Sequence, residues 1–167
     1  VLALPFLALG WYLTALVVIL LNRLLDGLDG ALARRRGLTD AGGFLDISLD
    51  FLFYALVPFG FILAAPEQNA LAGGWLLFAF IGTGSSFLAF AALAAKHQID
   101  NPGYAHKSFY YLGGLTEGTE TILLFVLGCL FPAWFAWFAW IFGALCWMTT
   151  FTRVWSGYLT LKSLQRQ

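Results

Sequence analysis

Apolar residues fall along this chain in five long stretches, separated by short segments of polar and turn-forming residues. The stretches cover residues 1–22, 44–65, 73–95, 109–131 and 135–158. Each is close to the roughly 20 residues that an α-helix needs to cross the hydrocarbon layer of a membrane. The pattern predicts an all-α fold, a polytopic membrane helix bundle with five transmembrane helices in a single domain over residues 1–167.

The composition indicates that lipid surrounds this bundle. Hydrophobic residues make up 60% of the chain and charged residues only 11%, which is more apolar surface than a soluble domain of this length can cover. Trp134, Trp137 and Trp140 follow Pro132 at a predicted helix end, where amphipathic rings favour the headgroup layer. We interpret them as an aromatic belt rather than a base-stacking platform, so membrane lipids are expected partners and nucleic acid is not.

Basic residues are confined to alternate helix ends and to the loops and tail that join them. They are Arg23, Arg34, Arg35, Arg36, Lys96, Lys107, Arg153, Lys162 and Arg166. The opposite loops, around residues 66–72 and 131–134, contain none. Since short loops rich in Lys and Arg stay in the cytosol, we expect an integral protein of a bacterial inner membrane, with its active site facing the cytosol.

Two pairs of aspartates lie near the polar end of the first two predicted helices. Asp26 and Asp29 are three residues apart, and Asp46 and Asp50 are four apart, so each pair shares one helix face. Only a short loop, about residues 35–41, separates the two pairs, which predicts antiparallel neighbouring helices. The four carboxylates are therefore expected to converge on one cleft.

Four like charges at membrane depth are costly unless a cation compensates them. Oxygen ligands alone favour hard divalent ions over zinc, and four carboxylates can bridge two ions about 4 Å apart. Mg²⁺ or Mn²⁺ would keep coordination positions for phosphate oxygens. The expected cofactor is thus Mg²⁺ or Mn²⁺, as two ions.

Small residues and one arginine accompany the acidic pairs. Gly27, Gly30 and Ala33 let a phosphate or a base approach the backbone closely, and Arg34 offers a planar donor fork to phosphate. Taken singly, acidic residues at helix ends are often solvated caps, and a short run of arginines is typical of a cytosolic loop. Their combination within 25 positions favours a metal-assisted phosphate site over packing alone.

The acidic segment resembles a known family motif. The run is DGLDGALARRRGLTDAGGFLDISLD, and it resembles the pattern D-x2-D-G-x2-A-R-x8-G-x3-D-x3-D of the CDP-alcohol phosphotransferase (CDP-alcohol phosphatidyltransferase) family. Its fixed positions correspond to Asp26, Asp29, Gly30, Ala33, Arg34, Gly42, Asp46 and Asp50. One departure is that seven residues, rather than eight, separate Arg34 from Gly42.

The resemblance also bears on the number of helices. Members of the family have six membrane helices, and the motif follows the second. Five predicted helices here imply that the family's first helix is missing and that the chain is truncated at its N-terminus.

The resemblance implies a phospholipid-biosynthetic transferase that moves a phosphatidyl or phosphoalcohol group from a CDP-linked donor, with CDP-diacylglycerol preferred, to an alcohol hydroxyl, and releases CMP. Asp26, Asp29, Asp46 and Asp50 would hold the metals, and Asp50 would also act as the catalytic base. Nucleotide-binding positions would be Asp29, Gly30, Ala33, Arg34 and Gly42. The acceptor would be a small alcohol or a lipid, and a homodimer is implied.

Three further residues are candidates for binding the acceptor: Lys107, Glu117 and Arg153. Glu117, together with Glu120, fits a polar contact between helices equally well. Arg153 can bind a phosphate, but extension of its side chain toward the headgroups is slightly favoured. Lys107 can contact anionic headgroups or be merely solvated.

A second group of small residues lies in the third predicted helix: Gly82, Gly84, Ser85 and Ser86. They favour close helix packing within the chain or a contact between subunits equally.

Three other functions remain open from the sequence. A divalent-cation transporter is one alternative, because acidic residues in membrane helices often line ion pathways. Hydrolysis of a CDP-linked lipid without transfer to an alcohol is a second. An inactive scaffold homologue, which the shorter loop allows, is a third.

Overall fold

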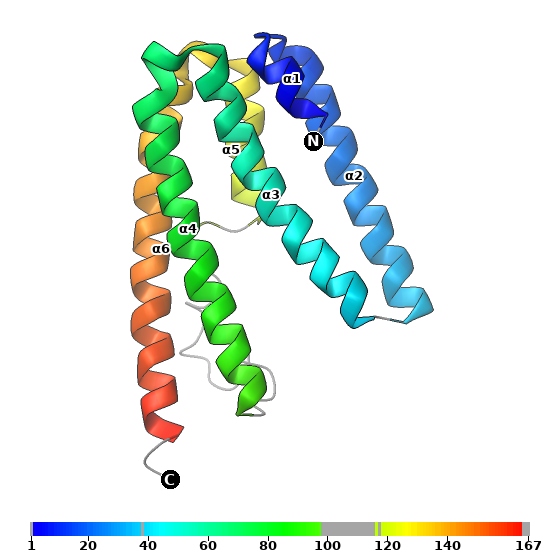
Figure 1. The fold of residues 1–167 in the computed structure, drawn as a ribbon, viewed down its shortest axis with the longest axis vertical. Helices are drawn as coiled ribbons and strands as arrows, with labels where there is room; N and C mark the ends of the chain where they lie inside the picture. Colours follow the sequence, from blue (N-terminus) through cyan, green and yellow to red (C-terminus); the bar gives the residue numbers. More distant parts are fainter. Residues whose placement is uncertain (1, 38, 98–115, 117, 165–167) are drawn as a thin grey trace.

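The computed structural model describes residues 2–37, 39–97, 116 and 118–164, apart from the side chains at positions 33, 34, 36 and 164. In chain order the elements are α1 (Ala3–Ala8), α2 (Tyr12–Arg36), α3 (Asp40–Ala64), α4 (Pro66–Lys96), α5 (Gly118–Leu130), the 3-10 helix η2 (Pro132–Trp134) and α6 (Phe135–Leu164) (Figure 1). Every regular element in these residues is a helix, so the predicted all-α fold is confirmed.

Among the residues that the structure describes, three helical segments are long and apolar enough to cross a membrane. They are α3, α4 and the segment Pro132–Ser163. Helix α3 contains the predicted span 44–65 except for its last residue, α4 contains the span 73–95, and the third segment contains the span 135–158. The protein is therefore a membrane-embedded helix bundle. The fourth predicted span begins at residue 109, and its first part lies outside the described residues; its remainder forms α5, which has 13 residues.

The first predicted span is wrong as a single helix. Helix α1 ends at Ala8, Gly10 adopts a φ of 75°, and α2 begins at Tyr12. Glycine allows this reversal because a positive φ costs it no steric clash. A separate six-residue helix thus precedes the motif-bearing helix. Six residues are too few to cross a membrane, so the absence of the family's first membrane helix stays a prediction.

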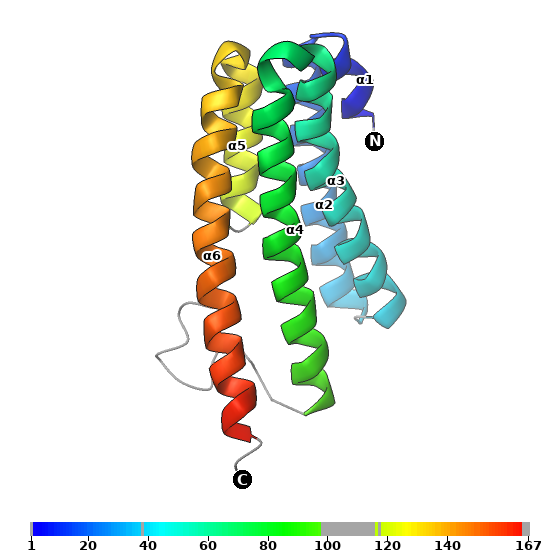
Figure 2. The same cartoon turned by 60° about the vertical axis from the view of Figure 1, so that its left-hand side comes forward.

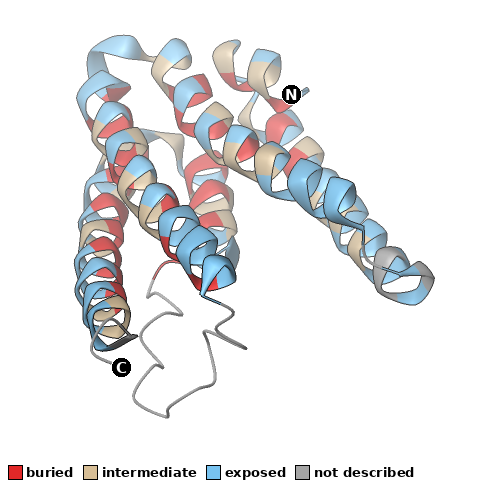
Figure 3. Cartoon of the chain, turned by 60° about the horizontal axis from the view of Figure 1, so that its bottom comes forward, coloured by how far each residue is buried: buried red, intermediate tan, exposed pale blue. Residues whose placement is uncertain are grey.

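The helices form two parts that meet near α1. Helices α4 and α6 pack along each other, α3 packs against α4, and α1 lies against both α2 and α3. Figures 1 and 2 show α2 and α3 as a hairpin that separates from α4 and α6 toward its turn. The buried core lies at the α1 end, where Phe61 of α3 stacks on Phe135 with ring centroids 4.0 Å apart. Figure 3 shows that the outer part of the hairpin is mostly exposed within this chain.

Small residues in α4 allow the close approach of its neighbours. A Cβ atom on Gly84 would overlap the ring of Phe51 in α3, and one on Gly82 would lie 3.1 Å from Thr150 Oγ1 in α6. Such contacts favour glycine at both positions, because a side chain at Gly84 would collide with the Phe51 ring and one at Gly82 would crowd Thr150. The packing interpretation of these two glycines is therefore confirmed.

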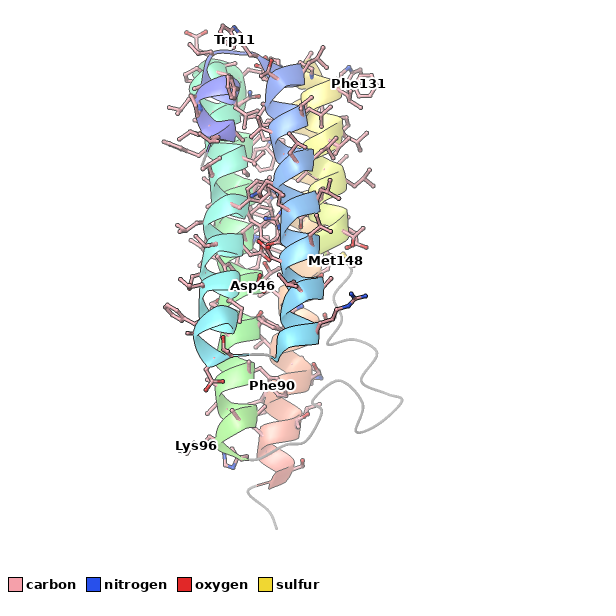
Figure 4. All side chains as sticks on the ribbon, turned by 90° about the vertical axis from the view of Figure 1, so that its right-hand side faces the viewer. Trp11, Asp46, Phe90, Lys96, Phe131 and Met148 are labelled. Carbon is pink, nitrogen blue, oxygen red and sulfur yellow. The ribbon has the colours of Figure 1, made fainter. Side chains whose placement is uncertain are left out.

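The two ends of the bundle differ in chemistry. Trp11 and Phe131 lie at one end and Lys96 at the other (Figure 4). Trp134, Trp137 and Trp140 are all more than 40% exposed. Trp134 ends η2 and the other two follow it in α6, close to Phe131 in the chain. This arrangement is what an aromatic belt at one membrane interface requires.

Candidate active site

The α2–α3 hairpin brings the two aspartate pairs to matching heights. Asp26 lies ten residues before the end of α2, and Asp50 lies ten residues after the start of α3. At about 1.5 Å per residue, both are about 15 Å from the turn. Asp29 and Asp46 form a second level, seven and six residues from the turn. The four acidic side chains therefore occupy two levels of one seam between the helices.

The turn of this hairpin is shorter than the predicted loop over residues 35–41. Helix α2 continues to Arg36, Gly37 has a φ of 105°, and α3 begins at Asp40. Thr39 caps α3, because its Oγ1 accepts a hydrogen bond from Gly42 N at 3.2 Å. From the sequence, both aspartate pairs were expected near helix ends. Instead, both pairs lie inside continuous helices, where backbone hydrogen bonds fix the direction of their side chains.

Arg23 joins the two helices at the deeper level of the seam. Its Nη1 donates to Asp50 Oδ1 at 2.7 Å and lies 3.5 Å from Asp26 Oδ2. The guanidinium lies over the ring of Phe53 in α3, 4.3 Å from the ring centroid. Its Nη2 also donates to Asn22 Oδ1 at 2.8 Å. One cation thus compensates an acid from each helix.

Asp26 interacts electrostatically with the other three carboxylates. The charge of Asp26 is close enough to be repelled by those of Asp29, Asp46 and Asp50. Asp26 and Asp50 are partly buried, whereas Asp29 and Asp46 are exposed, and Figure 4 shows Asp46 on α3 beside α2. The four aspartates therefore lie along one seam, and their convergence on a single cleft stays a prediction.

The donor set suits a hard divalent ion, but its members are not drawn together as ligands. Among the residues that the structure describes, no three His, Cys, Asp or Glu side chains are gathered closely enough to hold an ion. The chemistry still fits, because the seam supplies carboxylate oxygens whose mutual repulsion a cation would relieve. Asp50 Oδ1 is occupied by Arg23, so binding an ion requires side-chain movement.

The other motif residues are placed as follows. Gly30 is partly buried in α2, and Gly42 lies in the first turn of α3. A Cβ atom on Gly42 would lie 3.0 Å from Thr39 Oγ1, so glycine there keeps the cap undisturbed. Ala33 and Arg34 belong to α2, but their side chains are outside the described part of the chain, and so is any contact they make with a nucleotide.

The acceptor candidates do not form one described group. Lys107 and Glu117 lie outside the described residues. Glu120 is exposed in the first turn of α5. Arg153 is 7% exposed, and its Nη1 donates to the Thr83 carbonyl oxygen of α4 at 3.0 Å. Extension of Arg153 toward the headgroups is therefore wrong, since its side chain lies between α4 and α6.

Arg23 is the site residue that the sequence interpretation missed. It was counted only among the charges that orient the chain in the membrane. Its position three residues before Asp26 is a signal that could have placed it on the acidic face. The contact with Asp50, 27 residues away, could be found only from the three-dimensional arrangement.

Comparison with known proteins gives two matches. The family model described as CDP-alcohol phosphatidyltransferase matches residues 1–155. A relative from Escherichia coli (strain K12), named "Inner membrane protein YnjF", is 99% identical over 167 residues, which is 100% of this chain and 81% of that protein. No solved structure matches the chain. The relative's name gives a location and no reaction.

Proposed function

Because this chain belongs to the CDP-alcohol phosphatidyltransferase family, we propose that it transfers a phosphatidyl group from CDP-diacylglycerol to the hydroxyl of a small polar alcohol and releases CMP. The family points to transfer from a CDP-linked alcohol in general. The particular donor and acceptor are part of the proposal. A diacylglycerol acceptor with a different CDP-linked donor is the main variation within the same chemistry.

The observation that carries the proposal is the pairing of acids from α2 and α3 at two levels of one seam. Asp26 and Asp50 share Arg23, and Asp26 also interacts with the charges of Asp29 and Asp46. Four carboxylates held this way would repel one another without cations. A diphosphate is an anionic substrate that such a site can bind only through cations.

The proposed reaction forms one P–O bond and breaks another. The acceptor hydroxyl oxygen attacks the β-phosphorus of the donor, and its proton passes to a carboxylate oxygen of Asp50. The bond between the β-phosphorus and the oxygen that bridges to CMP breaks, so CMP leaves with the bonding pair. Asp50 suits the role of base because a positioned carboxylate within reach of a hydroxyl can accept its proton.

Two Mg²⁺ or Mn²⁺ ions, when bound, would neutralise the diphosphate and stabilise the charge on the departing CMP. Asp26, Asp29, Asp46 and Asp50 are the residues that would hold them. Arg34 would bind a donor phosphate, and Gly30, Ala33 and Gly42 would border the cytidine diphosphate. Lys107, Glu117 and Arg153 are proposed to shape the acceptor site.

We place the site on the cytosolic side of a bacterial inner membrane. The basic residues near the hairpin turn and at the end of α4 support this orientation, and a relative is named as an inner membrane protein. A homodimer is part of the same proposal. The extensive exposed apolar surface of this chain is compatible with both lipid and a second subunit.

The test is CMP release by the purified full-length protein in detergent with Mg²⁺ or Mn²⁺, CDP-diacylglycerol and a panel of alcohols. Asp50→Asn removes the base without changing side-chain size. Asp40→Asn is the matched control, because Asp40 is exposed in the first turn of the same helix and occupies none of the motif's fixed positions. We expect acceptor-dependent CMP release that is lost in Asp50→Asn and retained in Asp40→Asn.

Other results would assign other functions. CMP release without any alcohol would indicate hydrolysis. No release with any CDP-linked donor, from folded protein that binds Mn²⁺, would contradict the transferase and favour transport or a scaffold role. Equal activity in Asp50→Asn and the unmodified protein would exclude Asp50 as the base.

A further inference from the structure

Arg23 occupies the space where the deeper pair of acids faces each other. Its guanidinium contacts Asp26 on its own helix and Asp50 on α3, at 3.5 and 2.7 Å. Its side chain is 17% exposed, less than Asp26 at 40% and Asp50 at 30%. The cation is thus deeper in the seam than the carboxylates it joins.

Several further contacts hold the guanidinium in place. Asn22 Oδ1 accepts hydrogen bonds from Nε at 3.3 Å and from Nη2 at 2.8 Å. The ring of Phe53 lies 4.3 Å from the guanidinium carbon, a distance at which a cation and an aromatic face attract each other. This arrangement is a built cation position, because neutral groups fix the arginine while its charge is directed at the two acids.

A divalent ion bound between Asp26 and Asp50 would need the same oxygens and the same space. A guanidinium and a divalent ion a few ångströms apart repel strongly where water is partly excluded. An ion that binds Asp50 Oδ1 from the side where Arg23 Nη1 now lies would have to displace Nη1 and break its short hydrogen bond. The two cations therefore compete for one position.

We propose that Arg23 is a built-in competitor of the metal: it neutralises Asp26 and Asp50 in the metal-free protein and leaves Asp50 when a divalent ion binds. This inference rests on the proposed metal-dependent transferase. Arg23 is a positioning residue in it, not a catalytic one. Its effect is to keep α2 and α3 together without metal and to weaken the affinity for the ion.

The test measures Mn²⁺ binding directly, without substrate. Free Mn²⁺ has a six-line electron paramagnetic resonance spectrum that is lost on binding, so titration of full-length protein in detergent micelles gives Kd. The variant is Arg23→Gln, which keeps a polar side chain but removes the charge. Arg35→Gln is the matched control, since it removes the same charge from an exposed position of the same helix.

We expect Arg23→Gln to bind Mn²⁺ about tenfold or more tightly, because the competing charge is gone. Arg35→Gln should stay within about twofold of the unmodified protein, since exposed charges at that distance are screened. We also expect the rise in melting temperature on adding Mn²⁺ to be larger for Arg23→Gln, whose metal-free form lacks the countercharge. Arg23→Lys keeps the charge on a shorter side chain, so its Mn²⁺ affinity should lie between those of the unmodified protein and Arg23→Gln. It replaces Arg23→Gln in the test if that variant does not fold.

Unchanged or weaker Mn²⁺ binding in Arg23→Gln, or in Arg23→Lys if only that variant folds, would overturn the proposal. If binding is unchanged while acceptor-dependent CMP release persists, the transferase stands and only the competition is wrong. If neither the unmodified protein nor the variant binds Mn²⁺ while both are folded, the metal-dependent transferase fails together with this inference.

Discussion

Arg23 of α2 and Asp50 of α3 are joined by a hydrogen bond of 2.7 Å between two helices that are not otherwise among the closely packed pairs of the bundle. Both side chains are partly buried, so solvent screens the pair less than it would screen a surface ion pair. A polar contact therefore joins the two helices of the hairpin at the height of its deeper acids.

The first prediction concerns this pair in metal-free protein. Arg23→Gln and Asp50→Asn should each lower the free energy of unfolding, and the double variant should lose less than the sum. The interaction energy from this cycle should be about 1–3 kcal/mol, measured by equilibrium unfolding in mixed detergent and SDS micelles with EDTA present. A parallel cycle with Asp29→Asn, an exposed acid on the same helix as Arg23, should show a smaller coupling. Equal couplings in the two cycles would refute the specific pairing.

The second prediction concerns the contact between α3 and α4. Gly84→Ala would place a methyl group into the ring of Phe51, whereas Gly74→Ala, on the same helix, meets no atom within 4 Å. We expect Gly84→Ala to destabilise the protein by about 1–3 kcal/mol through overpacking. Gly74→Ala should be neutral or slightly stabilising, because alanine favours a helix over glycine. The check is the midpoint of detergent–SDS unfolding, and equal midpoints for the two variants would contradict the close approach.

The positions of most helices were predictable because a long apolar stretch in a membrane forms a helix, which satisfies its backbone hydrogen bonds internally. The predicted spans 73–95 and 135–158 lie inside α4 and α6, and 44–65 coincides with most of α3. The helices extend beyond these spans, since polar residues such as Asp40 continue a helix outside the hydrocarbon layer. Hydropathy cannot detect that extension, but Thr39 before Asp40 is an N-cap signal that could have located the start of α3.

The break between α1 and α2 and the role of Arg23 could not be obtained from hydropathy. The chain is apolar on both sides of Gly10, so its change of direction leaves no polarity signal. Spacing alone predicted the shared seam of the four aspartates, because a short connection forces antiparallel helices. The cation in that seam was missed because arginines near helix ends were treated as a group that orients the chain.

The third prediction concerns the first turn of α3, which directs Asp46 and Asp50 into the seam. Thr39→Ala would remove the acceptor of the Gly42 N–H and should cost about 1 kcal/mol. Thr39→Ser keeps the hydroxyl and should retain most of the stability. Hydrogen exchange of the amide of Gly42 gives the measurement, with faster exchange expected in Thr39→Ala only. Unchanged protection in Thr39→Ala would show that the cap does not hold this turn.

The last prediction concerns Arg153, whose buried guanidinium donates from Nη1 to the Thr83 carbonyl oxygen of α4 at 3.0 Å and lies 5.6 Å from the centre of the Phe87 ring. Arg153→Gln would lose this hydrogen bond between α4 and α6, and a hydrogen bond from a charged donor contributes about 1.5–3 kcal/mol. We expect a lower unfolding midpoint for Arg153→Gln. Lys162→Gln, an exposed charge on the same helix, should change it by less than about 1 kcal/mol.

Kinetics of the same Arg153 variant separate packing from acceptor binding. Loss of packing alone should lower the fraction of folded enzyme and leave the KM of the acceptor unchanged. If Arg153 binds the acceptor, the KM of the acceptor should rise in Arg153→Gln while the KM of the CDP-linked donor stays constant, because only the acceptor loses a binding partner. We expect the acceptor KM to rise, since charged residues inside membrane helices often mark a substrate pathway. An unchanged acceptor KM together with a lowered midpoint would assign Arg153 to holding α4 against α6.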